Sequence, residues 1–144
     1  MRPRIATAAG LALALAISGL ALAPSAVAAP AASSAAPSAT TLAPGFYAGG
    51  TWQLHQSNGP VVTVNLTQDS SGRLYGSGYY GGTSGTIEYG AVVDGTSITF
   101  VLSWSNGARG RYTGNLGADR RLSGITFDLN RPSNQASWST TRTF

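Results

Sequence analysis

The sequence predicts an all-β domain folded as an eight-stranded antiparallel up-and-down β-barrel, and three observations carry this prediction. Turn-forming residues recur at short intervals through the C-terminal part of the 144-residue chain. Between the turns, apolar and polar side chains alternate, which places them on opposite faces of a strand. Each short strand has one apolar face, so closure into a barrel removes the unpaired edges of an open sheet. A two-sheet β-sandwich of the same strands is the alternative.

Residues 1–28 have the form of a secretory signal peptide. Arg2 and Arg4 precede a long apolar run, which is followed by the small-residue site Ala26-Val27-Ala28. A charged start, an apolar stretch and such a triplet predict cleavage after residue 28. We therefore expect a secreted, extracellular protein without a membrane anchor once the signal is removed.

Residues 29–45 form a second, distinct segment. They are almost entirely Ala, Pro, Ser and Thr and carry no charge, so they offer little surface to bury and are predicted to be disordered. Residues 46–144 contain every Trp, Tyr and Phe of the chain. They are predicted to form one β-barrel domain, because this length is sufficient for an independent core.

Seven turn signals divide the predicted domain into eight strands. Turn-forming residues cluster at 57–60, 69–72, 81–82, 94–95, 106–107, 117–119 and 130–132. The Asp-Gly and Asn-Gly pairs among them favour hairpins because they accept positive φ angles. The predicted strands cover residues 51–57, 60–68, 73–80, 85–93, 96–105, 108–116, 121–129 and 135–143.

Alternation assigns an inward face to three of these strands. The apolar positions that we expect to point inward are Val62, Val64 and Leu66 in the second strand, Ile98, Phe100, Leu102 and Trp104 in the fifth, and Ile125, Phe127 and Leu129 in the seventh. An eight-stranded barrel has an interior that side chains just fill or that holds one small ligand.

Composition excludes several functional classes. The chain has no Cys, one His and only 10% charged residues, which leaves no thiolate chemistry and no obvious metal site. Its basic residues are all Arg, and removal of Arg2 and Arg4 leaves seven of them against five acidic residues, a net charge of +2. This small excess does not predict nucleic-acid binding.

Catalytic machinery is not expected either. The single histidine, His55, has the parity opposite to Trp52 and is predicted to point outward. Three of the five acidic residues lie in turns, where side chain to backbone hydrogen bonds explain them. Glu88 and Asp128 are predicted on polar strand faces, so no inward pair of carboxyl groups is available for acid–base work. The sequence thus favours a protein that is not an enzyme and needs no cofactor or metal.

Three segments resemble the avidin and streptavidin family of calycin barrels. Gly50-Thr51-Trp52 is similar to the opening of the first strand in that family, and residues 95–106 resemble its fifth strand without a gap. Residues 134–140 are similar to the stretch around the tryptophan that reaches into a neighbouring subunit. This resemblance implies the barrel fold, a pocket at its open end and, through Trp138, a homo-oligomer.

The resemblance extends to the apolar wall of the pocket more than to its polar contacts. Trp104 matches a pocket tryptophan, Tyr112 and Phe127 stand where the family has two more rings, and Asn58 occupies a polar position at the rim. The other positions that would satisfy the ureido group of biotin carry different residue types: Leu54, Gly78, Tyr80 and Arg142. Unsatisfied buried polar groups cost about 1–3 kcal/mol each, so tight biotin binding is not expected.

Two functional hypotheses follow. The first is a small-ligand-binding barrel that encloses a hydrophobic or partly aromatic ligand, with ligand contacts from Trp104, Tyr112, Phe127, Trp138 and Asn58. The second is a surface-recognition module, lectin-like or protein-binding, that has a solid core and uses exposed Tyr, Asn and Arg side chains. The residues predicted on the outer face of the fourth strand are too polar for that face alone to require a contact between subunits.

Overall fold

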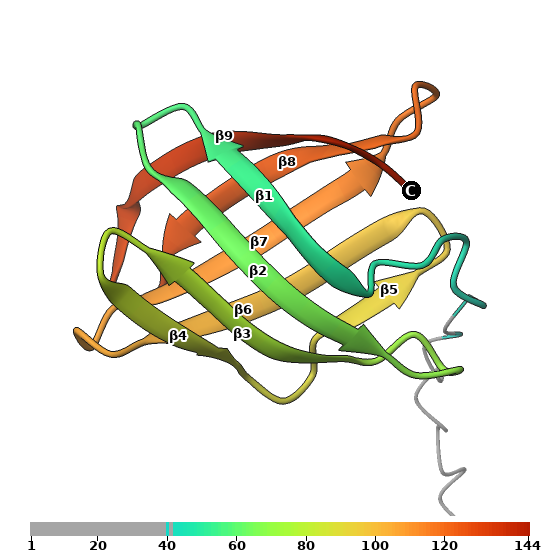
Figure 1. The fold of residues 1–144 in the computed structure, drawn as a ribbon, viewed down its shortest axis with the longest axis horizontal. Helices are drawn as coiled ribbons and strands as arrows, with labels where there is room; N and C mark the ends of the chain where they lie inside the picture. The colour runs from blue at the N-terminus through green and yellow to red at the C-terminus, as the bar shows by residue number, and fades with distance from the viewer. Residues whose placement is uncertain (1–39, 41) are drawn as a thin grey trace, which may run out of the picture. The chain divides into compact units, whose positions relative to one another are not determined.

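The computed structural model describes residues 40 and 42–144, and the strands in this part of the chain form one closed antiparallel barrel (Figure 1). The predicted signal peptide and most of the predicted low-complexity segment lie outside these residues. No helix in the described part of the chain is long and apolar enough to cross a membrane.

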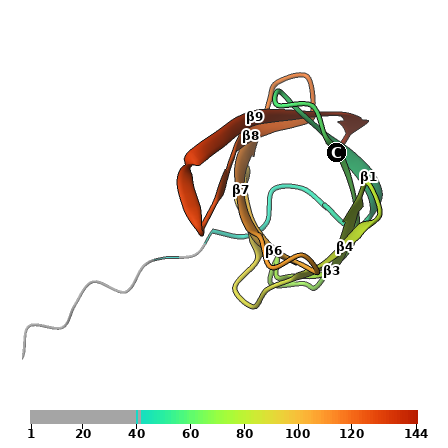
Figure 2. The same cartoon turned by 90° about the vertical axis from the view of Figure 1, so that its left-hand side faces the viewer.

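The described residues form nine strands, most of which are joined to the next by a short hairpin turn. They are β1 (Gly50–Gln56), β2 (Val61–Gln68), β3 (Leu74–Tyr80), β4 (Thr83–Ile87), β5 (Val92–Asp94), β6 (Ser97–Trp104), β7 (Arg109–Leu116), β8 (Arg121–Asp128) and β9 (Arg131–Thr143). Strand β9 pairs with both β8 and β1, and β4 pairs with both β3 and β6, so the sheet closes on itself (Figure 2). The predicted up-and-down barrel of eight strands is confirmed, with one extra short strand.

The extra strand arises because the predicted strand at 85–93 is divided. β4 and β5 both pair with β6, but residues 88–91 between them leave the ladder. Gly90 has φ +94 there, a left-handed conformation that a continuous strand does not accommodate. The two short strands share one position in the barrel, which therefore keeps eight strands around its circumference.

Inward faces follow the predicted alternation in β2 and β6. All seven apolar side chains assigned to the interior of these two strands are buried. The face predicted for β8 is wrong: Ile125 is 52% exposed, whereas Leu122 and Thr126 are buried. The Phe127 side chain also points outward. Its ring lies 5.9 Å from the Arg111 guanidinium carbon, on the outer face of the β7–β8 pair.

Trp138 explains this reversal. Its indole lies inside the barrel against β7 and β8, where a Cβ atom added to Gly114 would lie only 2.4 Å from the ring. The absence of a side chain at Gly114 therefore leaves room for the tryptophan. The apolar side chains of Ile125 and Phe127 remain on the outer surface of the sheet.

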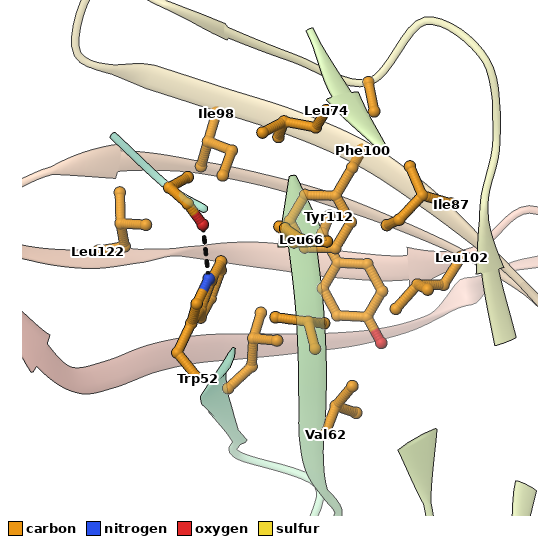
Figure 3. Packing of buried hydrophobic residues seen from close by; sticks show 14 of the residues in the cluster. Trp52, Val62, Leu66, Leu74, Ile87, Ile98, Phe100, Leu102, Tyr112 and Leu122 are labelled. Atoms are coloured by element: carbon orange, nitrogen blue, oxygen red, sulfur yellow. Dashed lines mark hydrogen bonds between the residues drawn. The ribbon is translucent and has the colours of Figure 1, made fainter. Parts of the chain in front are cut away.

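One end of the barrel is closed by aromatic side chains. Phe144 places its ring edge-on to Trp52 and Phe46, with centroid distances of 5.2 and 5.9 Å. The Trp52 indole donates a hydrogen bond of 2.9 Å to the Ala48 carbonyl, which Figure 3 shows within the buried cluster. These contacts form the floor of the barrel, opposite the hairpins that end β1, β3, β6 and β8.

Residues 42–45, which precede the first strand, pair with the connection between β5 and β6. Pro44 forms a parallel bridge with Gly95, and the Gly45 amide donates to the Gly95 carbonyl at 2.7 Å. The sequence assigned residues 42–45 to the low-complexity segment, but here they pair with the strand connection. The paired part of the chain thus begins before Phe46.

Candidate functional site

A cavity of about 140 Å³ opens at the end of the barrel opposite the floor. We call it the mouth cavity and define it by its fourteen lining residues. Its rings belong to Tyr80, Trp104 and Tyr112, its polar groups to Gln56, Asn58, Thr126, Asp128 and Asn134, and the rest of its lining to Pro60, Val62, Ala108, Gly110, Phe127 and Ala136. The hairpin topology brings residues from seven strands and two turns to this one place.

Two perpendicular rings form a corner of the mouth cavity. The centroids of Tyr80 and Trp104 are 4.7 Å apart and their planes meet at 90°. Trp104 rests on the backbone of β3 and β4: a Cβ atom at Gly85 would lie 2.7 Å from its ring, and one at Gly78 would lie 3.3 Å away. Because two glycines leave the space for this indole, its position is set by close packing.

Tyr112 joins the mouth cavity to the core. Its ring stacks on Phe100 with a centroid distance of 4.9 Å, and the side chain is 3% exposed. Burial raises the pKa of its hydroxyl from 10.0 to about 12, while hydrogen bonds with Thr126 and Gln56 oppose this rise. The hydroxyl therefore stays neutral at physiological pH and keeps its proton available for donation.

The raised pKa of Tyr112 predicts a loss of stability in alkali. The unfolded chain loses this proton near pH 10, whereas the folded chain keeps it until about pH 12. The stabilising contribution is complete below pH 10 and is lost as the pH rises toward 12, by about 3 kcal/mol in total. Denaturant titrations from pH 9 to 12 should show this extra loss in the wild type and not in Tyr112→Phe. Parallel losses in both proteins would contradict the assignment.

The structure brings together most of the site residues predicted from the sequence. Trp104, Tyr112 and Asn58 all line the mouth cavity. Phe127 is also part of the lining, although its ring faces the outer surface beside Arg111. The structure places Trp138 elsewhere: it is 2% exposed, does not line the mouth cavity and donates its indole N–H to the Ile125 carbonyl at 3.0 Å.

Several lining residues were missed by the sequence analysis. Asp128 was predicted on a polar outer face, and the reversed parity of β8 instead turns Thr126 and Asp128 toward the mouth cavity. Tyr80 and Asn134 are separated by more than fifty residues, and only the barrel topology brings them together. Within β8 itself no signal indicated the correct face, because Leu122, Gly124 and Thr126 are less apolar than Ile125 and Phe127.

Two carboxylates outside the mouth cavity, Asp69 and Glu88, have structural partners. The Asp69 carboxylate accepts hydrogen bonds from the Ser71 hydroxyl and from the backbone amides of Ser71 and Arg73, contacts that lower its pKa despite some desolvation. Glu88 forms an ion pair of 2.6 Å with Arg109 on the outer surface, and the hydrogen bond from Arg109 lowers the Glu88 pKa. Within residues 40 and 42–144, no group of three or more His, Cys, Asp or Glu side chains could hold a metal ion.

The fold and the mouth cavity define a class: a small β-barrel with one partly aromatic, partly polar cavity at its open end. The chain matches no protein-family model, no curated protein and no solved structure.

Proposed function

We propose that this protein is a secreted, non-enzymatic barrel of avidin-like type that binds one small ligand in its mouth cavity. The observation that supports this proposal is the meeting of a perpendicular aromatic pair, Tyr80 and Trp104, with five polar side chains around one small cavity. Ligand sites typically combine an apolar wall with a few polar groups that fix orientation.

The volume of the mouth cavity favours a ligand with a single ring. An engineered cavity of about 150 Å³ in another protein takes up benzene, and the mouth cavity is about 140 Å³. In this proposal, burial against Trp104 supplies most of the affinity, and Tyr112 and Asn58 orient the polar end of the ligand. Biotin, which has two fused rings and an acid tail, exceeds this space and is not expected to bind tightly.

Isothermal titration of the protein with benzyl alcohol, benzylamine and biotin tests the proposal. We expect at least one single-ring probe to bind, biotin to bind weakly or not at all, and Trp104→Ala to abolish the binding of the single-ring probes. Tyr89→Ala is the matched control, because Tyr89 is 93% exposed and does not line the mouth cavity. Circular dichroism verifies that each variant folds. Absence of heat with every single-ring probe, or equal binding by folded Trp104→Ala, would overturn the proposal.

A surface-recognition module is the second candidate, and the outer surface offers one observation in its favour. A groove of about 400 Å³ lies between the exposed rings of Tyr75 and Tyr89, with Arg73 and Asp94 in its lining. All three tryptophans are buried, so stacking on a glycan would fall to tyrosine. Retardation of the wild type in affinity gels that contain polysaccharide, lost in Tyr75→Ala/Tyr89→Ala, would support this function; unretarded migration would count against a glycan partner.

A further inference from the structure

We infer that the mouth cavity selects a positively charged ligand, an organic ammonium attached to a small ring, with Asp128 as its counter-ion. This inference rests on the proposed function and deepens it by naming the class of ligand. Three observations support this inference: the charge of the residues that line the mouth cavity, the hydrogen bond that holds the Asp128 carboxylate, and the chemistry of the side chains around that carboxylate.

Asp128 carries the only formal charge among the fourteen lining residues. It lies at the end of β8, where the inward parity of the strand directs it to the mouth cavity. Its Oδ1 atom accepts a hydrogen bond of 2.9 Å from the backbone amide of Asn130. This contact holds the carboxylate in place at the hairpin, so it does not need to be ordered by the ligand.

Within residues 40 and 42–144, no arginine forms an ion pair with this carboxylate. Among the residues that the structure describes, the one ion pair joins Glu88 and Arg109 on the outer surface. Arg131 is the register partner of Asp128 across the β8–β9 hairpin, but its side chain is exposed and makes no ion pair with it. A cation that enters the mouth cavity therefore meets a carboxylate that is not already paired.

The neighbouring groups also suit a cation. Trp104 and Tyr80 provide aromatic rings, whose faces attract positive charge. Asn58, Asn134 and Thr126 provide side-chain oxygens that can accept N–H hydrogen bonds. A buried charge is tolerated only when it is paired and hydrogen-bonded. The mouth cavity offers both conditions to an ammonium group, whereas its lining offers a carboxylate ligand hydrogen-bond donors but no cation.

Two probes of nearly the same shape test this inference. Benzylamine is a cation at pH 7 and benzyl alcohol is neutral, so their difference in affinity reports the charge of the bound group. Because hydrogen bonds that involve a charged group are stronger than neutral ones, we expect benzylamine to bind about tenfold more tightly by titration calorimetry. The preference should disappear in Asp128→Asn, which keeps an oxygen for the Asn130 amide. Asp119→Asn, in the β7–β8 turn at the opposite end, should leave the preference unchanged.

The outcomes separate this inference from the proposed function. If benzyl alcohol binds as tightly as benzylamine, the charge selectivity is overturned while ligand binding stands. Persistence of the benzylamine preference in folded Asp128→Asn would overturn the role of Asp128. If neither probe binds the wild type, the proposed function fails together with this inference.

Discussion

Replacement of Trp138 by alanine is expected to lower the free energy of unfolding by about 3–5 kcal/mol, the range for a large aromatic side chain removed from a core. The indole lies against Gly114 and donates to the Ile125 carbonyl, so its removal leaves a cavity between β7, β8 and β9. The midpoint of urea denaturation measures this loss. Tyr89→Ala, which removes an exposed ring, should change the stability by less than about 0.5 kcal/mol.

The same variant distinguishes the core position from a contact between subunits. A core residue predicts a loss of stability that does not depend on protein concentration and a mass by light scattering that is unchanged. An intersubunit residue, as the family resemblance implies for Trp138, predicts a small loss of stability together with a lower mass. The latter result would contradict the packing of Trp138 inside its own barrel.

Substitution of Gly85 by alanine is expected to damage both the stability and the ligand site. The added Cβ atom would lie 2.7 Å from the Trp104 ring, which must then tilt toward the mouth cavity. Overpacking of this kind costs about 1–3 kcal/mol, and the reduced cavity should weaken the binding of a single-ring probe by about tenfold. Denaturation and calorimetry of the same preparation measure the two effects.

A double-mutant cycle assigns this effect to Trp104. In the Trp104→Ala background the added methyl group has free space, so the stability cost of Gly85→Ala should fall by at least 0.5 kcal/mol, a typical coupling between residues in contact. Ser84→Ala, at the exposed neighbouring position of β4, is the matched control and should be nearly neutral. An unchanged cost of Gly85→Ala in both backgrounds would show that the substitution acts elsewhere.

The sequence was sufficient to predict the fold where local pattern and tertiary packing agree. In β2 and β6, branched or aromatic residues occupy every second position, and each of these side chains is buried in the barrel. Asp69 and Asp119 accept backbone hydrogen bonds in their turns, as expected for Asp at these positions. In these regions the period of the pattern and the turn chemistry were enough to define the structure.

The face of β8 could not be read from its own residues. Ile125 and Phe127 form the more apolar face, but the interior next to them is filled by Trp138 from another strand. A large side chain from β9 thus decides which residues of β8 can point inward, and this information is tertiary. The division of the fourth predicted strand is similar, since β4 and β5 are both held by β6 across the irregular residues 88–91.

The candidate site could likewise be predicted only in part from the sequence. Trp104, Tyr112 and Asn58 were predicted from the resemblance to the avidin family, and all three line the mouth cavity. Asp128 could not be predicted, because its inward position depends on the reversed face of β8. The charge of the mouth cavity, and with it the expected class of ligand, therefore appears only in the folded chain.

The three indole N–H groups of the protein allow the most direct test of a ligand site in the mouth cavity. Trp52 and Trp138 donate to the carbonyls of Ala48 and Ile125, whereas Trp104 lines the mouth cavity. We would record the ¹H–¹⁵N spectrum of the protein during titration with benzylamine. We predict that the Trp104 indole signal shifts with saturation while the other two stay in place. A saturable shift of the other indoles with Trp104 unchanged, or no shift at any concentration, would contradict binding in the mouth cavity.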